Sequence, residues 1–188
     1  MDNETITGLT RDLARDLDHH FEDLVLAFQG GLYAYAFRMS GCAQDAEELV
    51  QDVFIRAYRA LRTYEPDRIR SLALRAWLYR ICLNLLRNRG KRKGMHSEVL
   101  DEERHERNDG DHDPTASAVA RDETAGETQR LVATLPGKYR SAVLLRFAGE
   151  LSYPEMAHAL AQPEGTVKSN VHRGLAMLRQ SMEEREGR

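Results

Sequence analysis

The sequence predicts an all-α protein with two small helical domains joined by an acidic, flexible linker. Apolar residues recur at helical spacing along most of the chain, and the sustained apolar/polar alternation that marks strands is missing. The 188 residues suit two small domains, and a 41% share of apolar residues is enough to build their cores. Charge changes sign from segment to segment, which divides the chain into the same parts.

The charged residues form alternating blocks that the overall net charge of −3 conceals. Residues 1–55 and 94–127 are each strongly acidic, with 11 acidic side chains against 3 basic ones. Residues 56–93 hold 12 basic and 2 acidic side chains, and residues 128–180 hold 7 and 3. Two basic blocks separated by an acidic one indicate two contact surfaces for a polyanion such as nucleic acid.

Cysteine usage and the N-terminus indicate a reduced, cytoplasmic protein. Cys42 and Cys82 lie far apart with no CxxC pair, so we expect two buried thiols rather than a disulfide, a zinc ribbon or a thioredoxin-like site. Residues 1–18 are acidic and lack a basic segment followed by an apolar run, so they do not form a signal peptide. No stretch approaches the roughly 18–20 apolar residues of a membrane span, so we expect no membrane insertion.

Composition divides the chain into five segments. The stretch from His96 to Asp113 holds almost no large apolar side chains to offset the entropy of ordering it, which predicts a flexible linker there. An acidic extension precedes the first domain, and a short tail follows the second. The predicted bounds are 1–20 for the extension, 21–93 for the first domain, 94–127 for the linker, 128–181 for the second domain and 182–188 for the tail.

The first half of the chain is expected to form two helical blocks before residue 62. The first covers about residues 9–39. The second is an amphipathic helix over residues 45–61, whose inner face carries an apolar residue every four positions. Asp45 and Glu48 stand at the spacing of a capping arrangement, which predicts the start of this second helix at Asp45.

A basic helix is predicted over about residues 75–88, after a polar loop or broken helix at 62–71 that contains Pro66. We expect Gly90 to end this helix, and Trp77, Leu78, Ile81 and Leu85 to point inward. Asn84 and Asn88 are four residues apart, so both project from one face. Asparagine can pair bidentately with adenine or reach an unstacked base, while neighbouring cations hold phosphates.

The second domain carries the sequence pattern of a helix-turn-helix. Ser152 and Glu155 form a capping box that opens a short helix, residues 161–165 interrupt it, and Thr166 begins a second helix. On that helix Lys168, Ser169, His172 and Arg173 share the outer face, as the recognition helix of a DNA-binding domain requires. The predicted core comprises Leu131, Leu135, Val143, Leu144, Phe147, Leu151, Met156, Leu160, Val167, Val171, Leu175 (or Gly174) and Leu178.

These segments together resemble the sigma-70 family, and within it the small two-domain extracytoplasmic function sigma factors. DAEELVQDVFIRAY at 45–58 resembles the family's polymerase-docking helix, and RAWLYRICLN at 75–84 resembles its segment for the −10 element and melting. LPGKYR at 135–140, LSYPEMA at 151–157 and GTVKS at 165–169 resemble its −35 domain. The resemblance covers about residues 21–93 and 128–181.

The resemblance implies a bacterial transcription initiation factor that binds core RNA polymerase and promoter DNA and melts the DNA. The residues it assigns to polymerase docking are Asp45, Glu48, Gln51 and Asp52. Those it assigns to the −10 element are Arg80, Asn84, Arg87, Asn88 and Lys91, with the loop at 62–71 capturing a flipped base. Those it assigns to the −35 element are Thr166, Lys168, Ser169, His172 and Arg173.

Further implications concern the linker and control. The acidic linker would thread polymerase channels that otherwise hold nucleic acid. An anti-sigma factor is expected to hold the protein inactive by covering its polymerase-binding surfaces. Three features depart from the family's commoner pattern: Asn170 and Gly174 stand where Arg and Ala are frequent, and the loop at 62–71 lacks a Phe-containing, aromatic-rich form. These departures leave the family resemblance intact, but they limit what the resemblance implies about the promoter sequence.

Two alternatives belong to other functional classes. A regulator that uses only the helix-turn-helix would bind duplex DNA without polymerase, but it would not need the acidic docking helix. An enzyme would need a catalytic or cofactor motif, and none is present. His96, His105 and His112 are spaced by 9 and 7 residues in a segment predicted to be flexible, which fits no compact metal site well. We therefore expect no catalytic residues, cofactor or metal.

Overall fold

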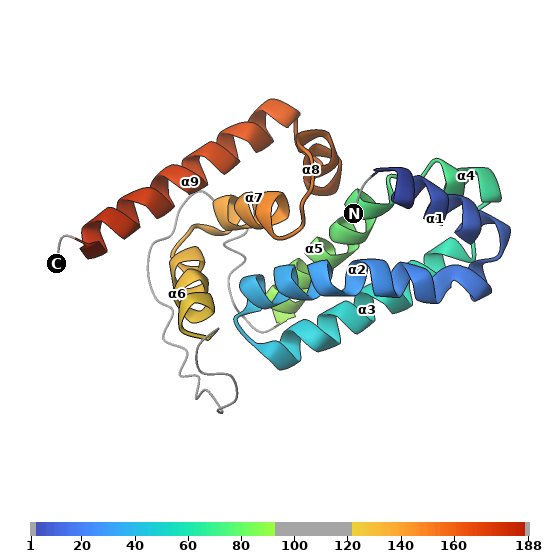
Figure 1. Ribbon diagram of the computed structural model, residues 1–188, viewed down its shortest axis with the longest axis horizontal. Helices are drawn as coiled ribbons and strands as arrows, with labels where there is room; N and C mark the ends of the chain where they lie inside the picture. The colour runs from blue at the N-terminus through green and yellow to red at the C-terminus, as the bar shows by residue number, and fades with distance from the viewer. Residues whose placement is uncertain (1–2, 93–121, 187–188) are drawn as a thin grey trace.

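The structure is a computed structural model that describes residues 3–92 and 122–186. All of its regular elements in this part of the chain are helices, as the sequence predicted (Figure 1). They are α1 (Asn3–Arg15), α2 (Leu17–Ser40), α3 (Ala43–Leu61), α4 (Pro66–Arg70), α5 (Leu74–Arg92), α6 (Asp122–Ala133), α7 (Gly137–Phe147), α8 (Tyr153–Leu160) and α9 (Glu164–Glu186).

The first helical block is two helices rather than one. Asp16 leaves the helical conformation at φ −151° and caps α2 by accepting a hydrogen bond from the backbone N–H of His19. This is the ordinary role of an aspartate at a helix start, because its carboxylate satisfies an otherwise unpaired N–H. Gly41 ends α2 in the left-handed conformation at φ 75°. The prediction of one block over residues 9–39 missed the helix start at Asn3 and the break at Asp16.

The boundaries of α3 and α5 also differ from the predicted ones. Cys42, without a side-chain cap bond, precedes α3, so Asp45 lies inside the first turn and the predicted capping arrangement is wrong. Gly90 does not end α5, which continues to Arg92. A glycine weakens a helix interior without forbidding it. Both cysteines are free: Cys82 is buried as predicted, whereas Cys42 is half-buried.

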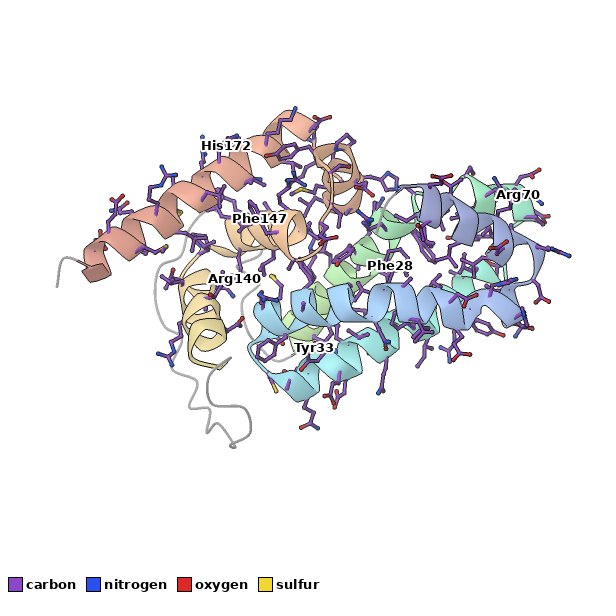
Figure 2. All side chains as sticks on the ribbon, viewed as in Figure 1. Phe28, Tyr33, Arg70, Arg140, Phe147 and His172 are labelled. Atoms are coloured by element: carbon purple, nitrogen blue, oxygen red, sulfur yellow. The ribbon has the colours of Figure 1, made fainter. Side chains whose placement is uncertain are left out.

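The C-terminal helices begin earlier and bury fewer residues than predicted. α6 starts at Asp122, inside the segment predicted to be linker. Phe147, at the end of α7, is 61% exposed, and Leu175 on α9 is 37% exposed, so both predictions of core residues were wrong (Figure 2). Gly174 takes the inner position beside Val171 instead. The other predicted core residues of this half are buried or half-buried.

One continuous core joins the two halves of the described chain. α5 packs against α3 on one side and against α8 on the other, and α2 contacts both α6 and α7 (Figure 1). Trp77 and Ile81 are half-buried, whereas Leu78 and Leu85 are fully buried as predicted. α5 is therefore enclosed by neighbours on most of its surface, which leaves only a narrow strip of it exposed.

Candidate functional surfaces

The four residues predicted to dock a polymerase lie together on α3. Asp45, Glu48 and Asp52 follow one another at spacings of three and four residues, and Gln51 stands beside them. Glu48 and Gln51 are exposed, whereas Asp45 and Asp52 are half-buried. The apolar side of α3, which includes Leu49, packs into the core. The structure thus brings the predicted residues together on one acidic surface.

Arg89 of α5 reaches across to this acidic surface. Its Nη2 lies 2.9 Å from Asp52 Oδ2 and its Nη1 lies 3.7 Å from Glu48 Oε2. Nη1 also donates a hydrogen bond of 3.1 Å to the backbone oxygen of Asp45. The sequence placed Arg89 only in the basic block at residues 56–93, because nothing in it showed that α5 packs against α3. One cation of the basic helix therefore partly neutralises the acidic surface.

Over residues 74–89, where the side chains of α5 are described, the exposed strip consists of Arg80, Asn84 and Asn88. These residues are four positions apart, so they form a line along one side of the helix. The side chains on either side of this line are buried or half-buried, including Leu83 and Leu85. The predicted pair of asparagines is therefore accessible and is carried by a helix that its neighbours hold firmly.

One other predicted residue of α5, Arg87, does not join this strip. Arg87 is half-buried, and its Nε is buried without a hydrogen-bond partner among the described residues. It lies close enough to Tyr35 to act electrostatically on that phenol, so it faces the junction between the two halves. The side chain of Lys91 lies outside the residues that the structure describes. Arg87 differs from the prediction because the side of α5 that carries it packs toward Tyr35 of α2 instead of facing solvent.

The loop before α5 carries a cation stacked on an aromatic ring, and this ring forms a tilted pair with a second ring on α5. The guanidinium carbon of Arg68, on α4, lies 3.6 Å from the ring centre of Tyr64. The Tyr64 ring in turn lies 6.1 Å from that of Trp77, two turns before Asn84 on α5. The loop therefore has an aromatic surface, although it lacks the phenylalanine that the resemblance led us to expect.

The helix-turn-helix forms from α8 and α9 as predicted. The hydroxyl of Ser152 accepts a hydrogen bond from the backbone N–H of Glu155, and Glu155 accepts one from the backbone N–H of Ser152. This capping box fixes the start of α8. Ala161 ends α8 in the left-handed conformation at φ 54°, and α9 begins at Glu164, two residues before the predicted Thr166.

All five predicted residues of α9 are exposed, and they lie on its outer side: Thr166, Lys168, Ser169, His172 and Arg173. Figure 2 labels His172 among them. Lys168 Nζ lies 2.7 Å from Glu164 Oε1, one turn earlier. The hydrogen bond to this carboxylate raises the pKa of the Lys168 ammonium. The same ammonium lies 5.4 Å from the ring centre of Tyr153, which places a cation at the junction of α8 and α9.

The two unusual residues of α9 both face inward. Asn170 is only 9% exposed, and its Nδ2 lies 3.4 Å from Gln162 Oε1, where it donates a hydrogen bond to the turn between α8 and α9. Gly174 lies where α9 approaches α7 closely: a Cβ there would lie 2.6 Å from Val143 Cγ2. Both residues therefore serve the packing of the helix-turn-helix.

Polar contacts hold the two halves of the described chain together. The hydroxyls of Tyr35 and Ser141 share a hydrogen bond of 2.9 Å, and both residues are buried. Burial raises the pKa of the Tyr35 phenol well above its usual range. Arg75 Nη1 donates to the backbone oxygen of Glu150, and Gln129 Nε2 donates to two carbonyls in the last turn of α2. The sequence pattern gave no sign of these long-range contacts.

Over residues 3–92 and 122–186, the structure shows no group of three or more metal-ligating side chains. The three histidines weighed as a metal cluster, at 96, 105 and 112, lie outside the described residues. No helix in the described part is long and apolar enough to cross a membrane.

Two parts of the chain match known families. The family described as Sigma-70 region 2 matches residues 24–94, and Sigma-70, region 4 matches residues 125–178. The first match contains α3, α4 and α5 together with most of α2. The second contains α7 and α8 and most of α6 and α9. The three predicted contact surfaces, on α3, α5 and α9, thus lie within the matched segments.

Curated relatives point to the same family. The chain is 34% identical to the ECF RNA polymerase sigma factor SigE of Mycolicibacterium smegmatis over 85% of its own length, although it spans only 60% of that protein. It is 32% identical to SigW of Bacillus subtilis, with 86% and 88% of the two chains covered. It is 35% identical to the RNA polymerase sigma-H factor of Pseudomonas aeruginosa, with 81% of each covered.

Solved structures share the fold. CnrH, solved in complex with the cytosolic domain of CnrY, superposes with a TM-score of 0.66 at 22% identity, covering 95% of this chain and 97% of that one. The sigma factor RpoE of Bartonella quintana, solved in complex with the anti-sigma factor NepR, gives a TM-score of 0.61 at 25% identity, with 87% and 96% covered. The chain therefore belongs to the sigma-70 family and is an extracytoplasmic function sigma factor, one of the proteins that direct RNA polymerase to promoters.

Proposed function

We propose that this sigma factor uses three surfaces: α3 binds the polymerase, α5 reads and melts the −10 element, and α9 reads the −35 element. The observation that carries the proposal is the exposure of all five predicted residues on the outer side of α9, the second helix of a helix-turn-helix. The chain supplies recognition, and the polymerase supplies the chemistry of RNA synthesis.

The proposed −35 contacts follow from the positions of the groups on α9. Thr166, Lys168 and Ser169 lie in its first two turns, where a recognition helix approaches base edges and phosphates. Arg173, one turn later, has the planar fork that pairs with the two acceptors of guanine. Lys168 is held by Glu164, so we assign it a phosphate contact rather than a base contact.

The proposed −10 contacts come from the strip of Arg80, Asn84 and Asn88. Two amides in line can pair with the edges of unstacked bases, and Arg80 can hold the adjacent phosphate. The stack of Tyr64 and Arg68 lies in the loop assigned to base capture. An aromatic ring offers any base a flat surface, which offsets part of the free energy of unstacking.

The proposed docking surface is acidic and therefore suits a basic partner. Glu48 and Gln51 are exposed. Arg89 of α5 forms ion pairs with Asp52 and Glu48 that fix their positions. We also propose control by an anti-sigma factor, because RpoE, one of the similar structures, is solved with one bound. When part of the holoenzyme the protein would lie in the cytoplasm, on the nucleoid.

The direct test is co-purification with bacterial core RNA polymerase, followed by run-off transcription from genomic fragments. We expect a stable complex that starts RNA at defined sites. Tight binding to duplex DNA by the protein alone, with no polymerase complex, would instead support a regulator that uses only the helix-turn-helix.

Single substitutions then separate the three surfaces. Asn84→Ala should impair promoter opening, and a pre-melted −10 template should restore activity. Arg173→Ala should weaken closed-complex binding by roughly 1–3 kcal/mol, the value of one bidentate base contact. Glu48→Lys should weaken the polymerase complex, because it reverses a charge on the docking surface.

Matched controls are available on exposed positions outside these surfaces. Arg179→Ala removes an exposed arginine nearer the C-terminus of α9, and Glu22→Lys reverses an exposed charge on α2. Both should behave like the unaltered protein. If Asn84→Ala and Arg173→Ala also leave transcription unchanged, the assignments on α5 and α9 are wrong, even though the family membership stands.

A further inference from the structure

The N-terminal helix α1 packs against the loop helix α4, although it precedes the segment that matches the sigma-70 family at residues 24–94 (Figure 1). Ile6, Thr10 and Leu13 are 9%, 3% and 1% exposed, and they recur at the spacing of one helix face. The buried hydroxyl of Thr10 is satisfied by donating to the backbone oxygen of Thr7. The N-terminal segment that the sequence predicted as an acidic extension thus contains an amphipathic helix with a buried stripe.

α4 has little of its own to hold it in place. It is five residues long, whereas isolated helices need roughly 12–15 residues to be even marginally stable in water. Glu65 precedes it without a side-chain cap bond, and Ile69 is its one buried residue. A helix this short takes its position from the surface it packs on, and α1 is the element that α4 contacts most closely.

Leu13 is a buried residue of α1 that lies beside α4. Together with Leu61, Pro66 and Ile69 it lines a surface hollow of about 390 Å³ between the α1–α2 junction and α4. Leu61 closes α3 and is itself 1% exposed, so this side of the hollow is fixed by the core of the domain. Leu13 therefore connects α4 to a rigid part of the fold.

The position of α4 determines the position of the aromatic stack. Arg68 belongs to α4, and its guanidinium lies over Tyr64 at 3.6 Å, beside Trp77 at the start of α5. By contrast, α5 is held by its own burial and does not depend on α1 to the same degree. A shift of α4 would consequently move the stack relative to the Asn84 strip.

We propose that α1 is a positioning element that sets the α4 loop for reading the melted −10 strand. This inference rests on the proposed function of that loop. Leu13 acts through α4, beside which it lies, and Ile6 acts by holding α1 in the core. Loss of either side chain should loosen α4, reduce discrimination between bases at the captured position, and leave polymerase docking on α3 intact.

The test compares Leu13→Ala and Ile6→Ala with two controls in the full-length protein. Leu13→Met keeps the apolar volume and should restore wild-type behaviour. Leu24→Ala removes an equally buried leucine of the same half that does not line the hollow. Run-off transcription is measured on a set of promoters differing at single −10 positions, and affinity for core polymerase is measured by competition.

We expect Leu13→Ala to lower the discrimination between preferred and changed bases roughly tenfold, about one base contact. Polymerase affinity should stay within about twofold, because the α3 surface is untouched. Tryptic cleavage after Arg68 and Arg70, normalised to cleavage after Arg179, should accelerate in the same variant. Leu24→Ala should lower transcription from all promoters in proportion, without changing the discrimination.

Each result decides between distinct conclusions. Unchanged base discrimination in both Leu13→Ala and Ile6→Ala would overturn the inference while the sigma function stands. An equal loss of discrimination in Leu24→Ala would also overturn it, because general destabilisation would then explain the effect. If the unaltered protein starts no transcription with core polymerase, the proposed function fails and the inference fails with it.

Discussion

α5 and α9 both present a polar strip for the proposed promoter contacts, but the rest of each helix lies in a different environment. α5 is enclosed by α3, α2 and α8, and its buried residues include Leu78, Tyr79 and Cys82. α9 rests on α7 and α8 through a narrow stripe of Val167, Asn170, Val171 and Gly174, with the remainder largely exposed. The helix proposed to read the −10 element is thus part of the core, whereas the helix proposed to read the −35 element lies on its surface.

This difference decides what a substitution can reveal. A change on the outer side of α9 affects few neighbours, so its effect on promoter binding can be measured without loss of stability. A change on α5 disturbs packing on two sides unless it is confined to the strip of Arg80, Asn84 and Asn88. A single helix that belongs to both a core and a contact surface couples stability to function more strongly than one on the surface.

The largest expected effect is on the free energy of unfolding, when a leucine is replaced by alanine on α5 and, for comparison, on α9. Leu78→Ala on α5 leaves a cavity at a fully buried position and should lower the free energy of unfolding by roughly 2–5 kcal/mol. Leu175→Ala on α9, where the side chain is 37% exposed, should change it by no more than about 0.5 kcal/mol. Urea denaturation measures both. Equal losses would remove the contrast between the helices.

The next effect tests the close approach of α9 to α7 at Gly174. Gly174→Ala places a methyl group 2.6 Å from Val143 Cγ2, so it should destabilise the protein by roughly 1–3 kcal/mol, despite the better helix propensity of alanine. Adding Val143→Ala removes the obstructing methyl groups. In that background Gly174→Ala should be neutral or stabilising, and a double-mutant cycle measures the coupling. If Gly174→Ala alone raises stability, α7 can move away and the contact is not tight.

The sequence predicted α9 better than α5, for a physical reason. The outer residues of α9 face solvent, so their spacing alone placed them correctly. The residues of α5 have partners from α2 and α3, far away in the sequence, and these partners turned Arg87 and Arg89 away from the expected surface. The break at Asp16 was hidden because apolar periodicity continues across it. From the sequence, Gly174 could be judged only by its low helix propensity, because the close approach of Val143 depends on how α7 and α9 pack.

Alkaline pH should destabilise the surroundings of α5. Burial raises the pKa of the Cys82 thiol to about 12 from an ordinary value of 9.0, and burial also raises the pKa of Tyr79. The unfolded chain therefore releases these protons first, so stability is complete below about pH 9 and falls as pH rises toward 12. Between pH 8 and 10 the thiol alone should cost roughly 1 kcal/mol.

Cys82→Ala isolates this contribution. Urea denaturation of the variant between pH 8 and 10 should show a shallower loss of stability than the unaltered protein shows. Cys42→Ala serves as the control, because that thiol is only half-buried and its removal should leave the slope unchanged. Parallel slopes for all three proteins would mean that solvent reaches Cys82 in the folded state.

The smallest expected effect is the coupling free energy of an ion pair, which we compare between one pair on α5 and one pair on α9. Arg89 and Asp52 join α5 to α3 at 2.9 Å, with 27% and 45% of their side chains exposed. The Arg89 guanidinium also bonds the backbone of Asp45, which reduces the entropy lost in forming the pair. Lys168 and Glu164 form a pair of similar length within α9, but both are well exposed and lie on a single helix. Solvent and salt weaken such a pair almost completely.

Double-mutant cycles with Arg89→Ala and Asp52→Asn, and with Lys168→Ala and Glu164→Gln, measure the two couplings. We expect at most about 1 kcal/mol for the first pair, decreasing modestly at higher salt. We expect no measurable coupling for the second. A coupling at Lys168 as large as that at Arg89 would show that α9 depends on its surface charges for stability. The charged residues on its outer side would then contribute to folding stability as well as to the proposed DNA contact. The two helices would then differ only in how deeply they are packed in the core.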